Sequence, residues 1–211
     1  MKKLGLIFMC MFLATSVFAI DITIGGAAGV NTSFMTGSDW TDMLDAMEAN
    51  NSFMKFGFEI GAFADIAIND LFSIQPEVNF LLLRYGSSDL TWQGKDVKPT
   101  LSMKVFEIAV LPKFNFNNFS VFLGPAVQFV LGDLTFKDSV TSGSAESETV
   151  DVPTDKSVVF SGIFGAGYAM PMGNGNLMFD ARYRRAFASA IDDFNGRLNT
   201  ISLRVGYGFG L

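Results

Sequence analysis

Apolar and small or polar side chains alternate at every second position through most of this chain, and this pattern limits its possible folds severely. Every even-numbered side chain of residues 54–66 is apolar, and so is every odd-numbered side chain of residues 201–211. Successive side chains of a β-strand point to opposite faces, so the pattern predicts strands with one apolar face. After residue 19 no apolar stretch is long enough to cross a membrane as a helix.

Composition indicates that lipid covers the apolar face. Charged residues make up 17% of the chain, and there are 23 Phe and 21 Gly, whereas ordinary soluble domains carry about 25% charged residues. A soluble barrel would need a charged exterior on every strand, but the second face here is mainly Gly, Ala, Ser, Thr and Asn. That face suits a crowded lumen and predicts an outer-membrane β-barrel. A soluble periplasmic ligand-binding barrel is the rival interpretation.

The first residues resemble an export signal. Lys2 and Lys3 precede an apolar run, and small residues lead up to Ala19, which predicts a signal peptide over residues 1–19. The run is shorter than an anchor helix requires, and Cys10 lies too early for a lipoprotein site. Residues 20–211 then form one barrel domain with a net charge of −8, against −6 for the whole chain, which argues against nucleic acid as a partner.

Eight alternating segments are separated by connections that are short and long in strict turn. The short ones are tight turns at 69–70, 117–118 and 172–175, rich in residues that tolerate positive φ. The long ones are loop 1 (35–52), loop 2 (87–100), loop 3 (132–156) and loop 4 (188–196). This arrangement predicts an all-β, eight-stranded antiparallel up-and-down transmembrane barrel with short periplasmic turns and long surface loops. The expected strands are 22–34, 53–67, 71–86, 101–114, 119–131, 157–171, 176–187 and 197–211.

The residue types argue against an enzyme. The chain has no histidine, and its single cysteine, Cys10, lies in the predicted signal peptide. Ser-His-Asp and Cys-His catalysis and the usual transition-metal sites therefore lack their residues. A carboxylate pair remains chemically able to act as acid and base. We expect no catalytic residues, no metal and no cofactor.

Charged residues on the second face predict an ion network inside the barrel. Most lie seven to nine residues from the nearest turn or from the C-terminus, hence in one layer near mid-barrel, and Asp65 and Lys113 are expected to pair nearer the turns. An eight-stranded barrel is barely wide enough for side chains, so these ions must pair or hold water. They either fill the lumen or form an ion-selective constriction. The expected members are Glu59, Glu77, Glu107, Asp180, Arg182 and Arg204.

Five large side chains are expected on the same inner face and favour a plugged lumen. They are Phe63, Leu81, Tyr85, Met103 and Phe122.

Two loops carry further signals. Loop 1 has apolar residues at helical spacing behind Ser38, a suitable N-cap, which predicts a short amphipathic helix. The helix either packs on the rim or covers a hydrophobic entry. Loop 3 is rich in Ser, Thr and carboxylates and is expected to be a mobile, solvated acidic surface. The expected apolar residues of the loop 1 helix are Trp40, Met43, Leu44 and Met47.

Several motifs resemble the small outer-membrane β-barrel family, the OmpX-like or "porin family" barrels. Residues 162–168 form a glycine-alternating strand, a short turn follows at 171–173, and Asp180-Ala181-Arg182-Tyr183 ends the motif. Residues 74–77, 107–114 and 123–125 are similar to the family's third strand and central hairpin. The chain departs from the family pattern at Ala109, at Arg185-Ala186 and at Leu211. The resemblance implies the fold and an outer-membrane location but no agreed activity.

Together these features predict a monomeric, non-enzymatic outer-membrane barrel. It is expected to act as a structural element or through acidic surface loops that contact an extracellular partner. The alternative function is a narrow channel or a conduit for small or hydrophobic solutes. The other expected partners are outer-membrane lipids and the assembly machinery, which would read the C-terminal strand at Tyr207 and Phe209.

Overall fold

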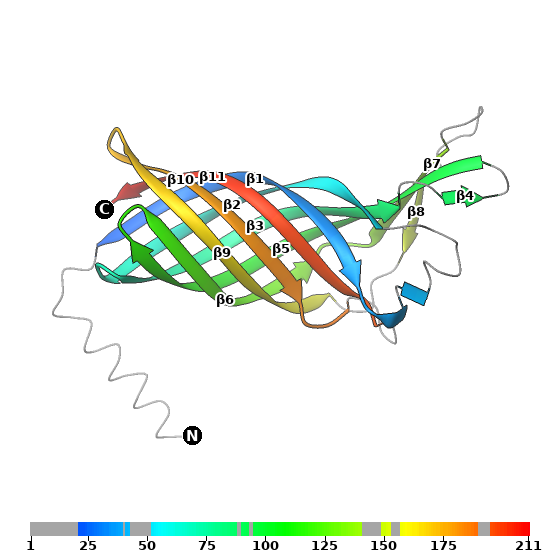
Figure 1. The fold of residues 1–211 in the computed structure, drawn as a ribbon, viewed down its shortest axis with the longest axis horizontal. Coiled ribbons are helices and arrows are strands. Elements are labelled where there is room, and N and C mark those ends of the chain that lie inside the picture. The colour runs from blue at the N-terminus through cyan, green and yellow to red at the C-terminus, as the bar shows by residue number, and fades with distance from the viewer. Residues whose placement is uncertain are drawn as a thin grey trace, which may run out of the picture.

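Eight long antiparallel strands close into a barrel in the computed structural model (Figure 1). Each pairs with the next along the chain, and β1 pairs with β11 to complete the ring, so the predicted up-and-down barrel is confirmed. The structure describes residues 21–39, 41–42, 52–87, 90–92, 95–140, 149–152, 157–189 and 195–211. The barrel strands are β1 (Ile22–Thr36), β2 (Ser52–Asn69), β3 (Phe72–Ser87), β5 (Lys95–Phe116), β6 (Phe119–Val130), β9 (Val158–Met172), β10 (Gly175–Ala186) and β11 (Arg197–Gly210).

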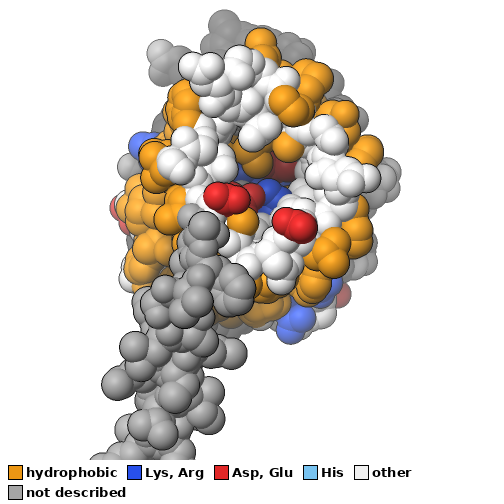
Figure 2. All heavy atoms as spheres, turned by 90° about the vertical axis from the view of Figure 1, so that its left-hand side faces the viewer, with side chains coloured by type: hydrophobic (Ala, Val, Ile, Leu, Met, Phe, Trp, Pro, Cys, Tyr) orange, Lys and Arg blue, Asp and Glu red, His pale blue; other side chains and the backbone are white. Residues whose placement is uncertain are grey.

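The predicted faces of the strands are the observed ones. Phe56 is 72% exposed on the outer wall, whereas Glu59, three residues further on, is 2% exposed inside. On β11, Leu203 is exposed and its neighbour Arg204 is buried. Figure 2, which looks at the turn end, shows apolar side chains around the outside and charged side chains within the opening. The barrel thus presents its apolar face outward.

Three tight turns join the strands at one end. Asn117 and Gly173 take positive φ values of 56° and 63°, as the turn chemistry predicts. The first turn differs by one residue from its predicted position at 69–70. It is formed by Asp70 and Leu71, because the side-chain oxygen of Asn69 accepts hydrogen bonds from the backbone N–H groups of Leu71 and Phe72.

Three prolines interrupt hydrogen bonding in the wall without shifting its register. Pairing between β5 and β6 is lost between Ala109 and Lys113, beside Pro112 and Pro125, and resumes in the same register. Pairing between β2 and β3 behaves likewise beside Pro76. A proline removes one donor, and the flanking pairs hold the strands in place.

The loop end contains more strand than expected. Strand β5 begins at Lys95, six residues before the predicted start, and pairs there with β4 (Leu90–Trp92). Loop 3 contains β7 (Leu134–Val140), which pairs with β5, and β8 (Thr149–Val152), which pairs with β7. The loop that was expected to be a mobile acidic surface thus contains two paired strands. These strands extend beyond the barrel at the end opposite the C-terminus (Figure 1).

Only the start of the predicted loop 1 helix lies within the described residues. Ser38, Asp39, Thr41 and Asp42 are helical, and the carbonyl of Gly37 accepts the first hydrogen bond, from Thr41 N at 3.1 Å. The cap is therefore Gly37, because Ser38 donates its hydroxyl to Asp39 instead. The predicted apolar stripe (Trp40, Met43, Leu44, Met47) and the signal peptide (1–19) lie outside the described residues. None of the helical residues that are described forms a helix able to cross a membrane.

Candidate functional site in the barrel lumen

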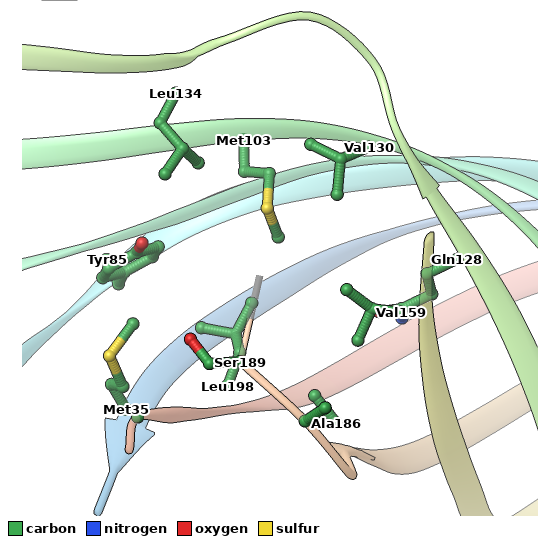
Figure 3. Close-up of a pocket in the computed structure, with 12 residues that line it drawn as sticks. Met35, Tyr85, Met103, Gln128, Val130, Leu134, Val159, Ala186, Ser189 and Leu198 are labelled. Atoms are coloured by element: carbon green, nitrogen blue, oxygen red, sulfur yellow. The ribbon is translucent and has the colours of Figure 1, made fainter. Parts of the chain in front are cut away.

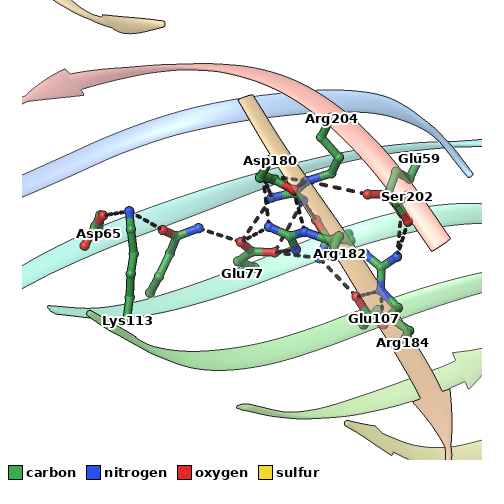
Figure 4. A network of polar contacts seen from close by, with 12 residues as sticks. Glu59, Asp65, Glu77, Glu107, Lys113, Asp180, Arg182, Arg184, Ser202 and Arg204 are labelled. Carbon is green, nitrogen blue, oxygen red and sulfur yellow. Dashed lines mark hydrogen bonds and ion pairs between the residues drawn. The ribbon is translucent and has the colours of Figure 1, made fainter. Parts of the chain in front are cut away.

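One contact of the lumen joins two opposite walls of the barrel. Arg182 on β10 donates from Nη1 and Nη2 to the two carboxylate oxygens of Glu77 on β3, at 2.8 and 3.1 Å. Strands β3 and β10 lie four places apart in the eight-strand ring. Arg182 Nε also donates to Asp180, two residues earlier on its own strand, at 2.7 Å. Figure 4 shows Arg182 between these two acids.

Arg204 on β11 reinforces this contact. Its Nη2 donates to Asp180 at 3.0 Å and to Glu77 at 3.2 Å, and its Nη1 donates to the side-chain oxygen of Asn79 at 3.1 Å. Glu77 thus faces two arginines. A buried carboxylate needs such compensation, because removing it from water without a partner costs several kcal/mol.

A third arginine, Arg184, was missing from the sequence prediction. Its Nη1 donates to Glu59 on β2 at 2.8 Å, and its Nε donates to Glu107 on β5 at 3.1 Å. Ser202 also contacts Glu59, at 3.1 Å. The alternation that places Asp180 and Arg182 inside also places Arg184 inside, so the signal was present in the sequence.

The pair expected near the turns is joined to the main network. Lys113 contacts Asp65 and also donates to the side-chain oxygen of Gln75 at 3.2 Å. Gln75 in turn donates to Glu77 at 2.6 Å. A further amide, Gln128, donates to Glu107 at 2.9 Å. The amide of Asn79 donates to Glu77 at 3.1 Å and to Glu107 at 3.2 Å. All six predicted ions therefore belong to one connected set, with amides as bridges that the sequence analysis did not identify.

Large side chains fill the rest of the lumen. The five large inner-face residues of the sequence prediction are all buried, and the ring of Phe122 lies 5.0 Å from the Arg182 guanidinium. Glycines on the inner face make room for such rings. An ideal Cβ on Gly165 would lie 2.4 Å from two carbons of Phe122, so only glycine fits there without displacement.

Two apolar clusters complete the filling. One surrounds Phe122 and contains Ala109, Leu111, Ala126 and Ile163. The other closes the loop end and contains Leu81, Leu83, Met103, Val105, Val130, Leu134, Val159 and Ala186.

A small cavity remains inside the loop-end cluster. It has a volume of about 40 Å³ and is lined mainly by apolar side chains, among them Met35, Met103 and Leu198 (Figure 3). Leu134, at the start of β7, lies over it, so loop 3 supplies part of the closure. The volume holds a few water molecules at most.

Some polar atoms of the network lack a hydrogen-bond partner within the described part of the chain. They include Arg184 Nη2, Glu59 Oε1 and both amide atoms of Asn31. Atoms of this kind are commonly satisfied by buried water. Among the described residues no group of carboxylates has the arrangement of a metal site.

The model of one protein family matches residues 15–192, and its description is outer membrane protein beta-barrel domain. The chain belongs to this family. Membership confirms the predicted location in the outer membrane, where the exposed apolar wall contacts lipid, so the soluble periplasmic alternative was wrong. No curated protein matches the chain.

Several solved structures are similar to the barrel. The attachment invasion locus protein Ail of Yersinia pestis, crystallised with the heparin analogue sucrose octasulfate, is 17% identical, with a TM-score of 0.45, over 91% of this chain and 100% of Ail. Neisserial surface protein A is 17% identical, with a TM-score of 0.44, over 88% and 95%. OprG from Pseudomonas aeruginosa is 15% identical, with a TM-score of 0.41, over 92% and 96%.

Proposed function

We propose that this protein is a non-conducting, non-enzymatic barrel that acts through its loop end. The observation that carries the proposal is the filled lumen. The Arg182–Glu77 contact crosses the full width of the barrel, and a buried apolar cluster covers it on the loop side. An ion would have to displace both the Arg182–Glu77 pair and the apolar cluster in order to pass through the barrel.

The loop end offers a raised surface for a partner. Strands β5, β7 and β8 pair in succession beyond the barrel, and within the described residues β8 pairs only with β7. The unpaired edge of a strand presents free backbone donors and acceptors that another chain can use. Loop 3 carries six Asp and Glu against two Lys. The partner that fits this surface is a basic protein segment outside the cell.

Two measurements test the proposal. In planar lipid bilayers the folded protein should give no single-channel currents, and regular conductance steps would contradict it. Cells that display the protein should bind a labelled oligolysine peptide. Neutralising Glu146, Glu148, Asp151 and Asp155 to their amides should abolish that binding while the barrel stays folded. Unchanged binding by the neutralised variant would exclude loop 3 as the interaction surface.

The cavity in the loop-end cluster supports a second candidate, a conduit for small hydrophobic solutes. Its apolar lining suits such a solute, but its volume of about 40 Å³ is smaller than an aromatic ring requires, so the cluster would have to open. Replacing Leu134 by Ala should then increase the uptake of toluene into liposomes that contain the protein. No difference from empty liposomes, in either form, would exclude this function.

We also propose that the barrel is a monomer and that the assembly machinery recognises β11. Within β11, Tyr207 and Phe209 form an edge-to-face ring pair with centroids 4.9 Å apart. A signal read from the outer face needs such side chains accessible, and Phe209 is exposed. Replacing both by Ser should leave folding in detergent intact and slow insertion by the machinery in cells.

A further inference from the structure

On the barrel strands whose side chains are described, the charges that face outward are all positive and lie near the loop end. All acidic residues on the eight barrel strands whose side chains are described face the lumen: Glu59, Asp65, Glu77, Glu107 and Asp180. The charged side chains that face outward on the described parts of these strands are all basic and all exposed: Arg84, Lys104, Arg185 and Arg197. None of these four forms an ion pair with a described residue.

Strand register groups the four into two pairs. Lys104 is directly opposite Leu82, and Arg84 is opposite Ser102, so Arg84 and Lys104 are diagonal neighbours on β3 and β5. Such neighbours lie roughly 7–8 Å apart, with their Cβ atoms somewhat closer, within reach of long side chains.

The second pair has the same relationship on β10 and β11. Arg185 is opposite Asn199, two residues from Arg197. Each pair can therefore enclose one anionic group from two sides.

The apolar wall beneath the pairs sets their depth in the membrane. On β3, six outward-facing apolar residues lie between the turn end and Arg84, from Phe72 to Leu82. On β5, six outward-facing apolar residues follow Lys104, from Phe106 to Phe116. Ten residue steps of roughly 3.3 Å on a strand tilted about 40° span about 25 Å, the height of the apolar band of such barrels. The pairs thus lie at the headgroup level of the leaflet at the loop end.

A polar contact marks the same level beside the second pair. The hydroxyl of Tyr183 donates to the side-chain oxygen of Asn199 at 2.6 Å, and the amide of Asn199 donates to Thr36 at 3.0 Å. Tyrosine is enriched where a barrel wall meets the headgroups. At the turn end, by contrast, the exposed charges at the strand ends are acidic, at Asp21 and Asp70.

We propose that the pairs Arg84/Lys104 and Arg185/Arg197 bind the phosphate groups of anionic lipid headgroups in the leaflet at the loop end. Guanidinium and ammonium groups are the side chains suited to phosphate. Unpaired basic residues above an apolar wall leave the phosphates of the surrounding lipid as the complementary charge. The occupant is a lipid, because the same side chains rise from a surface that acyl chains cover.

Titration with lipid A, a diphosphorylated glycolipid, tests this proposal on the folded protein in zwitterionic micelles. Replacing both members of either pair by Gln should weaken lipid A binding at that pair by roughly 25-fold, since each basic residue near a charged headgroup contributes about fivefold. The charge-retaining variant Lys104→Arg and the distant variant Asp21→Asn/Asp70→Asn should bind like wild type. Heat-modifiable migration of every variant verifies folding.

Three results would overturn the proposal. One is unchanged lipid A affinity in both paired variants, and another is equal binding of dephosphorylated lipid A. The third is competition by inorganic phosphate alone at concentrations comparable with lipid A, which would make the pairs simple anion sites. Because the titration involves no loop contact, failure of the surface-interaction proposal would not affect its outcome.

Discussion

Arg182 and Glu77 connect opposite walls of the barrel through two parallel hydrogen bonds, although 105 residues separate them in the chain. Both side chains are fully buried. The contact is therefore a desolvated ion pair that also links two opposite strands across the lumen. Its burial and its position predict how substitutions change the stability of the barrel.

Removing one partner of this contact should destabilise the barrel strongly. Glu77→Gln leaves Arg182 and Arg204 with one fewer buried carboxylate, and breaking a buried pair in this way costs about 3–5 kcal/mol. Urea unfolding in lipid vesicles measures the loss. The exposed turn control Asp70→Asn should change the free energy of unfolding by less than about 1 kcal/mol. A Glu77→Gln barrel as stable as the control would show that the network is not structurally important.

A methyl group added at Gly165 should displace the ring of Phe122. The Cβ of Ala would lie 2.4 Å from that ring, and overpacking of this kind costs about 1–3 kcal/mol. The matched control is Gly26→Ala on the outer wall, where the nearest atom would lie 3.5 Å away and no cost is expected. Equal unfolding midpoints for the two variants would contradict the packing of Phe122 against Gly165.

Shortening leucines should distinguish the interior from the lipid-facing wall. Leu83→Ala leaves a cavity in the loop-end cluster and should cost about 2–5 kcal/mol. Leu123 is 63% exposed on the outer wall, where acyl chains close over the shortened side chain, so Leu123→Ala should cost less. Unfolding in vesicles gives both values, and a larger loss for Leu123→Ala would mean that the two faces had been exchanged.

Acid should separate loop 1 from loop 4. The backbone N–H of Asn195 donates to the Asp39 carboxylate at 2.9 Å, and this bond, followed by that from the Ser38 hydroxyl, holds the pKa of Asp39 below its usual range. A lowered pKa in the folded state means that the contact is fully present above the ordinary carboxyl pKa. It is lost as the pH falls through the lower, folded value.

The Asn195 amide proton reports on this contact by NMR. Its shift should stay constant from neutral pH down to the ordinary carboxyl range and move only below it. The Asp39→Asn variant should show no such transition. A transition at or above the ordinary pKa of an aspartate would contradict the hydrogen bond.

Alternation reveals which side of the wall a residue occupies, but not what it meets across the lumen. The inward placement of Glu59 and Arg204 follows from position along the strand alone, and so does that of Arg184, which escaped notice. That Arg184 reaches Glu59 and Glu107 depends on how the strands are staggered around the ring, which no local pattern encodes. The bridges through Gln75 have the same origin.

The loops were less predictable for a related reason. Strand β7 has a partner only because β5 continues past the end of the barrel, so its pairing is a long-range effect. The tight turns were better predicted, because they depend on one or two residues such as Asn117 and Gly173. The shift at Asn69 arose from a side-chain hydrogen bond that competes with the expected turn.

The seam between β1 and β11 consists of fourteen residue pairs, from Thr23–Gly210 to Thr36–Arg197. The first and last strands of the ring are therefore mutual neighbours. Until β11 pairs with it, β1 has one edge without hydrogen-bond partners. Unpaired edges of this kind can pair with other chains. Other copies of the chain must therefore be kept from pairing with this strand during passage through the periplasm. The β1–β11 ladder can form only after β11 has reached the barrel.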